Sequence, residues 1–291
     1  RRDCCRDGDC FVLADFKPGR GASLNMTGLY LFFALVLAAV FGSFGNVLIH
    51  RLPRMILGDA APDVSTAPHT FNLNHPASHC PHCLVPLRWW HNIPLLSFLF
   101  LRGQCAHCHA SIAWRYFVVE AGCVAMAWLC VHQFGMTANA LAYFVFLYAL
   151  WILSWIDGLH YLLPDAITLP LIVAGVLFQF TLGHIPWTQA LMAAALAYAL
   201  LRLVYHVHFA LTRREGLGFG DMKLFAAIGA WLGLLALPQV LLLACLLALV
   251  WLLMARLFQN RSPLIPLGPF LSVAAMIELH CPQLLLKWLG L

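Results

Sequence analysis

Two acidic residues stand at the borders of long apolar segments, where a charged side chain is costly. Asp157 closes an apolar run in "WIDGLHYLLPD", and Asp221 precedes another in "GLGFGDMKLF". Ionisable groups at membrane depth are expensive, so each is a functional candidate. If the two carboxyls meet, like-charge repulsion lets one keep its proton while the other stays ionised. One could then activate a water while the other protonates a leaving group, as in an aspartic protease.

Simpler interpretations exist for the acids of this region. Asp221 could be a helix N-cap before "MKLF", favoured by the helix dipole. Asp165 follows Pro164, and we expect it to cap the helix that begins there. Glu215 is expected to be a solvated loop acid. The alternate glycines of "GLGFG" permit unusual backbone angles and let a peptide approach closely.

A second chemical feature is a group of cysteines with metal-ligand spacing. Cys80 and Cys83 form one CxxC pair, and Cys105 and Cys108 form a second. The full pattern is Cys-x2-Cys-x21-Cys-x2-Cys. Four thiolates from two such turns complete a tetrahedral site, which is typical of structural zinc and leaves no position for a substrate. The alternatives are two disulfides, four unrelated thiols, or replacement of a cysteine ligand by a neighbouring histidine, namely His82, His107 or His109.

The composition predicts an all-α, polytopic membrane protein. The 291 residues are 62% hydrophobic and 10% charged, whereas a soluble domain carries about 25% charged residues. About eight segments are long and apolar enough to span a bilayer. These lie near 28–49, 113–133, 138–156, 166–184, 187–211, 222–236, 238–257 and 268–289. The net charge of +5 is spread among short loops, so we expect no nucleic-acid partner.

Charge bias in the loops predicts the orientation. Lys and Arg gather in the loops near 50–112, 212–221 and 258–267, and the connections near 134–137, 185–186 and 237 contain neither. By the positive-inside rule, the basic loops face the cytoplasm. Two complete spans separate Asp157 from Asp221, which puts both acids at the cytoplasmic edge.

These observations divide the chain into four parts. Residues 1–25 are mixed in charge and precede Met26, so we expect them to be an upstream extension. Residues 26–49 hold the first transmembrane helix, and 50–112 form a cytoplasmic Cys4 zinc loop. Residues 113–291 form a seven-helix domain that carries both acids.

An ordered set of motifs resembles the type IV prepilin leader peptidases, which are membrane aspartic proteases of the GxGD type. After "GSFGNVLIHRLP" at 42–53 come the double CxxC with "NIPLLSFLFLRG" inside it, and then "RYFVVE" at 115–120. The remaining motifs are "IDGLHYLLPD", "REGLGFGDMKLFAAIGAWLG" and "IPLGPFLS". The resemblance runs from about residue 28 to about 275.

The resemblance implies a bifunctional enzyme of the bacterial inner membrane. Such enzymes cut the leader from prepilins or pseudopilins at the cytoplasmic face, and many then methylate the new N-terminus with S-adenosylmethionine. The family's catalytic pair matches Asp157 and Asp221, and its zinc-type cysteines match the two CxxC pairs. The client would be a type IV pilus or a type II secretion system. One departure is Leu159, where relatives commonly have a second aspartate.

The methyl-transfer site is implied by the resemblance alone, since no glycine-rich nucleotide motif is present. Gly103 matches a family glycine linked to methyl transfer, with a simple turn as the alternative. Glu120 is the other candidate for cofactor binding, and Asn46 and Arg51 lie near the same membrane edge. Arg51 and Arg115 could instead be interface anchors.

Three other functions remain open from the sequence. The first is a peptidase without methyltransferase activity. The second is a zinc-stabilised membrane scaffold for pilus or secretion assembly. The third is a transporter, whose acids would be expected near the bilayer midplane rather than at span ends.

Overall fold

The structure is a computed structural model, and it describes residues 23–58, 72–75, 77–214, 216–259 and 265–282. Glu215 lies outside the described residues, as does the expected extension up to residue 22. Residues 23–25 of that extension already belong to the first helix.

The described chain is helical, as predicted, and contains no β-strand. Its elements are α1 (Ser23–Leu57), η1 (Trp89–Asn92), α2 (Leu96–Phe100), α3 (Arg115–Phe134), α4 (Ala138–His160), α5 (Asp165–Thr181), α6 (Trp187–Thr212), α7 (Phe219–Leu232), η2 (Leu234–Ala236), α8 (Leu237–Gln259) and α9 (Gly268–His280).

The count of eight spans is not confirmed. Five helical segments are long and apolar enough to cross a membrane: Gly28–Leu57, Arg115–Phe134, Ala138–His160, Trp187–Thr212 and Leu234–Leu257. The segments expected at 166–184, 222–236 and 268–289 correspond to the shorter helices α5, α7 and α9. A helix of 14 residues, such as α7, is only about 21 Å long, less than the roughly 30 Å hydrocarbon core.

Helix α7 can be short because protein rather than lipid surrounds it. Every residue of α7 from Leu224 to Trp231 is buried, and the helix packs against α5, α6 and α9. Two glycines allow close approach: a Cβ on Gly229 would lie 2.9 Å from the carbonyl oxygen of Ala193, and one on Gly175 would lie 2.7 Å from the Trp231 ring. Small residues at helix contacts are the usual basis of tight packing in membranes.

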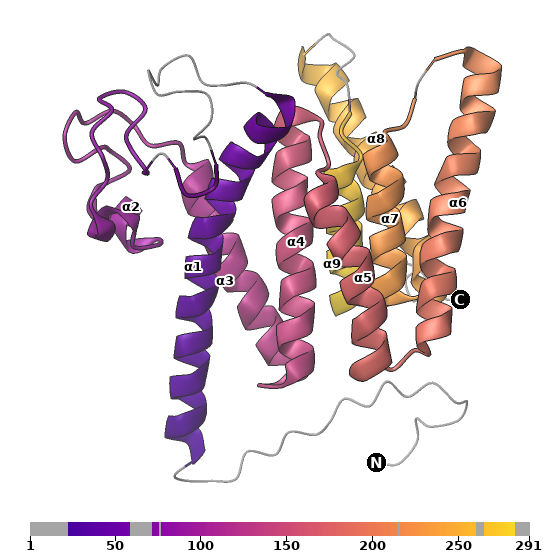
Figure 1. The fold of residues 1–291 in the computed structure, drawn as a ribbon, viewed down its shortest axis with the longest axis horizontal. Helices are drawn as coiled ribbons and strands as arrows, with labels where there is room; N and C mark the ends of the chain where they lie inside the picture. Colours follow the sequence, from indigo (N-terminus) through magenta and orange to yellow (C-terminus); the bar gives the residue numbers. More distant parts are fainter. Residues whose placement is uncertain (1–22, 59–71, 76, 215, 260–264, 283–291) are drawn as a thin grey trace.

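The long helices run up and down through one bundle, so alternate connections lie at the same end (Figure 1). The last residues of α4, α6 and α8 and the first residues of α5, α7 and α9 share the end of the bundle at which α1 also ends. The end of α4 and the beginnings of α7 and α9 therefore lie at one end of the bundle.

Helix α1 continues past residue 50, where we expected the loop to begin, through Pro53 to Leu57. Arg51 is consequently part of this helix and is only 9% exposed. Its Nη1 donates to the backbone oxygens of Asn72 and Leu73, each at 3.0 Å. Arg51 therefore ties α1 to residues of the loop that follows it.

Candidate active site and metal centre

Asp157 lies in the last turn of α4 and is held by the beginning of α9. Its side chain is 6% exposed, and its Oδ2 accepts the backbone N–H of Gly268 at 3.0 Å. A Cβ on Gly268 would lie 2.6 Å from that same oxygen. Gly268 therefore lets the backbone of α9 approach the carboxylate closely. Sequence reasoning did not assign this residue a role, although "IPLGPFLS" contains it.

Asp221 is the third residue of α7 and is 9% exposed. The N-cap of this helix is Gly218, so the interpretation of Asp221 as the N-cap is wrong. Its Oδ2 lies 3.1 Å from the Cβ position of Gly218, and its Oδ1 is buried with no hydrogen-bond partner. A buried carboxylate oxygen left without a donor is costly for stability, and such groups concentrate at functional sites.

Asp157 and Asp221 lie on neighbouring elements, because α9, whose Gly268 contacts Asp157, also packs against α7. The link between α4 and α5 contributes to this proximity, because a Cβ on Gly220 would lie 2.6 Å from the Cβ of Leu163. Leu163 is six residues after Asp157, and Gly220 directly precedes Asp221. The folded chain thus brings the borders of two apolar segments together, as the span count predicted.

Asp165 does not cap its helix, which corrects the expectation from the sequence. The N-cap of α5 is Pro164, with no side-chain capping bond. The Asp165 carboxylate instead receives two hydrogen bonds from Lys223 Nζ, at 2.6 and 2.7 Å. This ion pair links the beginning of α5 to α7, two residues beyond Asp221.

The four cysteines of the loop converge, as their spacing predicted. Their Sγ atoms all lie within 4.8 Å of one another, with Cys80 and Cys108 at 3.8 Å and Cys83 and Cys105 at 4.0 Å. A regular tetrahedron with Zn–S bonds of about 2.3 Å has S–S edges of about 3.8 Å, so the cluster fits zinc. The described cysteines form no disulfide, and the neighbouring histidines lie outside this ligand group.

Both CxxC turns have the same backbone geometry. Leu84 and His109 each follow the second cysteine of their pair, and they have φ values of 56° and 55°. Their backbone N–H groups donate to the carbonyl oxygens of Cys80 and Cys105, at 2.9 and 3.1 Å. Hydrogen bonds from backbone N–H groups, first that of Cys108 and then that of His107, lower the pKa of the Cys105 thiol to about 6, which favours the metal-binding thiolate.

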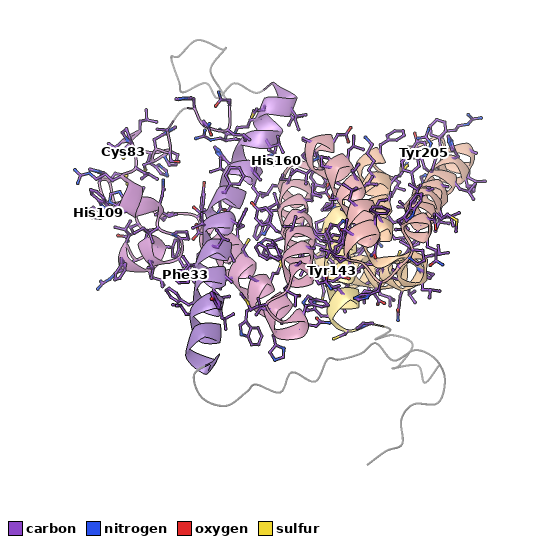
Figure 2. All side chains as sticks on the ribbon, turned by 60° about the horizontal axis from the view of Figure 1, so that its bottom comes forward. Phe33, Cys83, His109, Tyr143, His160 and Tyr205 are labelled. Atoms are coloured by element: carbon purple, nitrogen blue, oxygen red, sulfur yellow. The ribbon has the colours of Figure 1, made fainter. Side chains whose placement is uncertain are left out.

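The cysteine cluster is separate from the two acids. Figure 2 shows Cys83 and His109 at the outer edge of the molecule, whereas His160, three residues after Asp157, lies on the bundle. A metal held by the four cysteines could therefore stabilise the loop without contacting the carboxyls.

The residues expected to bind a methyl donor have structural partners. Glu120 is buried in α3, where its Oε2 accepts the backbone N–H of Leu95 at 2.8 Å. Gly103 forms a turn before the second CxxC pair, with a φ of 69°, as the simpler alternative predicted. The ring of Phe98 lies 3.1 Å from the Cβ position of Gly103 and packs on the α3 residue Phe117.

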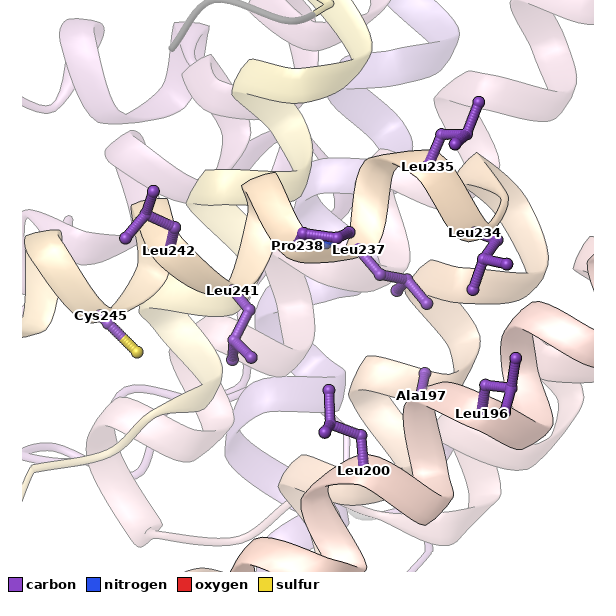
Figure 3. Close-up of a pocket in the computed structure, with 10 residues that line it drawn as sticks. All are labelled: Leu196, Ala197, Leu200, Leu234, Leu235, Leu237, Pro238, Leu241, Leu242 and Cys245. Atoms are coloured by element: carbon purple, nitrogen blue, oxygen red, sulfur yellow. The ribbon is translucent and has the colours of Figure 1, made fainter. Parts of the chain in front are cut away.

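A groove of about 780 Å³ lies between α6 and the η2–α8 segment (Figure 3). Its lining is apolar: Leu196, Ala197, Leu200, Leu234, Leu235, Leu237, Pro238, Leu241, Leu242 and Cys245. It adjoins the C-terminal end of α7, whereas Asp221 occupies the first turn of that helix. The groove has no acid–base chemistry and is not part of the two-acid site.

Comparison with known proteins places these features in a family. A model of the bacterial peptidase A24 N-terminal domain matches residues 36–134, and a model of the type IV leader peptidase family matches residues 144–253. A prepilin leader peptidase/N-methyltransferase from Burkholderia pseudomallei is 39% identical over 266 residues, covering 87% of this chain and 86% of the relative. This chain belongs to the type IV leader peptidase family.

Other members of the type IV leader peptidase family show the same extent of similarity. Relatives with the same name from Stutzerimonas stutzeri and Klebsiella pneumoniae are 39% and 43% identical, over 84% and 75% of this chain and 89% and 90% of their own lengths. No solved structure matches the chain significantly. The four cysteines fall within the first matched segment, and both acids fall within the second.

Proposed function

We propose that this chain is a bifunctional prepilin peptidase that removes the leader of type IV prepilins or pseudopilins and then methylates the new N-terminus. The family membership and the names of the relatives support both activities. The observation that carries the proposal is the placement of Asp157 and Asp221, two buried carboxyls at one end of the bundle on elements that α9 joins.

The two carboxyls would act as an acid–base pair. The ionised carboxylate takes a proton from a water, whose oxygen adds to the scissile carbonyl carbon. The protonated carboxyl then gives its proton to the departing amine as the C–N bond breaks. The unpartnered Oδ1 of Asp221 is free to receive or hand over a proton, while the Gly268 N–H fixes the Asp157 carboxylate.

The location of the pair suits a substrate that is itself membrane-bound. A prepilin brings its scissile bond to the membrane surface, just before its hydrophobic segment. The acids lie at the helix ends rather than in mid-bundle, at the end shared with the basic connections. With the positive-inside rule, this placement supports a site at the cytoplasmic face of the bacterial inner membrane.

Methylation would depend on the segment between α1 and α3. S-adenosylmethionine would supply the methyl group, and the new amine of the cleaved pilin would receive it. Zinc on the four cysteines would be structural, because a complete thiolate set leaves no open coordination position. Gly103 and Glu120 would shape the adjoining surface through their contacts with the α2 region.

The decisive experiment incubates the purified protein with a prepilin and S-adenosylmethionine and reads the N-terminal mass of the product. We expect loss of the leader and gain of one methyl group. Asp157→Asn and Asp221→Asn should each abolish cleavage. Glu278→Gln is the matched control, because this acid is near the opposite end of α9 from Gly268 and contacts Gln239.

The outcomes distinguish the alternative functions. Cleavage without methylation would identify a peptidase only. Unchanged cleavage in both aspartate variants would refute the two-acid proposal. A scaffold would leave the prepilin mass unchanged in every variant, including the wild-type protein. A transporter would move solute across vesicles while leaving that mass unchanged.

A further inference from the structure

The short helix α2 exposes large apolar side chains in the segment between the two CxxC pairs. Leu96, Leu99 and Phe100 are 51%, 59% and 82% exposed, and we call these three residues the α2 face. The surrounding stretch "IPLLSFLFL", residues 93–101, contains no charge. An apolar run of this kind is unusual on a loop that lies wholly in water.

Contacts with α3 fix the depth of the α2 face relative to the bundle. Leu95, which precedes α2, donates its N–H to Glu120, and the ring of Phe98 packs on that of Phe117 at 5.4 Å between centroids. Glu120 is the sixth residue of α3, a helix long and apolar enough to span the membrane. At 1.5 Å per residue, α2 is therefore anchored about 8 Å inward from the beginning of that span.

The overall view agrees with this depth. Figure 1 shows α2 beside α1, level with the body of the bundle rather than beyond the ends of its helices. The polar layer of a bilayer is about 5–8 Å thick on each side of the hydrocarbon core. An element anchored about 8 Å inward from the beginning of α3 thus lies at the boundary between headgroups and acyl chains.

The flanking residues are of the types that occupy a membrane interface. Arg88 and Arg102 border the apolar stretch, and the guanidinium of Arg88 lies 5.1 Å from the centre of the Trp90 ring. Trp90 and Trp114 are 42% and 68% exposed. Tryptophan is enriched at the interface, and long basic side chains extend from apolar surroundings towards phosphate groups.

We propose that the α2 face inserts into the acyl-chain boundary of the same bilayer that the bundle spans. The loop is then held at two places, by α3 on one side and by lipid on the other. The lipid occupant is favoured over a second protein because the α2 face lies at the depth of a membrane-spanning helix and is bordered by interfacial residue types.

Insertion has a consequence that rests on the proposed function. It would keep the two CxxC turns and Gly103 at the membrane surface, where the new N-terminus of a cleaved pilin emerges. The loop would then reach its substrate without a large movement from solvent.

Photolabelling from the lipid side tests the insertion without any substrate. The full chain is reconstituted in nanodiscs with a phospholipid that carries a diazirine in its acyl chain, and labelled peptides are mapped by mass spectrometry. We expect adducts on residues 93–101 and on the exposed side chains of α1, and none on residues 105–112. Because activity is not measured, a chain that failed to cleave prepilin would still give this pattern.

A matched pair of variants identifies the side chains responsible. Leu99→Asn removes an apolar contact from the α2 face, and we expect labelling of 93–101 to fall about tenfold or more. Leu84→Asn changes a leucine of similar exposure on the first CxxC turn, at a positive φ that asparagine tolerates, and should leave labelling unchanged. Metal content checks that both loops are folded.

Two results would overturn the proposal. One is a wild-type protein in which the lipid probe labels α1 but does not label residues 93–101. The other is labelling of residues 93–101 that Leu99→Asn leaves unchanged in a folded loop.

Discussion

Gly268→Ala is a small change that tests how Asp157 is positioned. The added Cβ would lie 2.6 Å from Asp157 Oδ2, the oxygen that accepts the Gly268 N–H. Gly268 does not have a positive φ, so alanine fits the backbone. The substitution therefore acts on the Asp157 carboxylate rather than on the fold of α9.

The size of the effect follows from the contact distance. Ordinary van der Waals contact begins near 3.4 Å, so the oxygen must retreat by about 0.8 Å. A misplacement near 1 Å in a catalytic site can cost about 100-fold in rate, which corresponds to about 2.7 kcal/mol. Stability should change by less than about 1 kcal/mol, because a compatible Gly→Ala change is itself mildly stabilising.

The assay compares Gly268→Ala with Gly158→Ala. Gly158 directly follows Asp157, and its Cβ would meet only Pro269 Cγ, at 3.9 Å. Initial rates of prepilin cleavage are measured for both variants, with thermal unfolding as the check of stability. We expect kcat to fall about 100-fold for Gly268→Ala and to stay near the wild-type value for Gly158→Ala.

A wild-type rate in Gly268→Ala, at unchanged stability, would refute the inference that this close contact positions the catalytic carboxylate. A loss of rate matched by an equal loss in Gly158→Ala would also contradict it, because the effect would then follow from any change near Asp157.

Three further predictions concern the surrounding contacts. Lys223→Met breaks the ion pair with Asp165. Because the Lys223 and Asp165 side chains are 27% and 57% exposed, the free energy of unfolding should fall by only about 0.2–1 kcal/mol. A fall above about 2 kcal/mol, measured by thermal unfolding, would contradict this. Cys105→Ser should decrease the amount of zinc bound and the rate of methyl transfer, and should leave the rate of cleavage unchanged. Loss of cleavage in a folded variant would contradict a metal centre that is separate from the two acids. Glu120→Leu leaves the Leu95 N–H unpaired, which should lower the free energy of unfolding by about 1–3 kcal/mol. We expect faster amide hydrogen exchange around α2 in this variant. Unchanged exchange would contradict a stabilising role of this hydrogen bond.

Local patterns in the sequence predicted part of the site. The CxxC spacing predicted the convergence of four cysteines, because each pair forms its own tight turn. Counting two spans between Asp157 and Asp221 predicted that both lie at one end of the bundle. The family resemblance is confirmed by the matched models and relatives.

The remaining features depend on contacts between distant parts of the chain. Gly268 reaches Asp157 across 111 positions, and Lys223 reaches Asp165 across 58. A local capping rule cannot anticipate such a partner, so Asp165 was misassigned. The short length of α7 likewise reflects its enclosure by other helices, which hydropathy alone does not reveal.

The most direct test of the two-acid mechanism is a single-turnover measurement with purified Asp221→Asn in excess over the prepilin. The product is read by mass spectrometry, and binding of the prepilin is measured in the same sample. The account predicts that the prepilin binds and that no leader is released. Accumulation of cleaved pilin at a rate near that of the wild-type protein would contradict it.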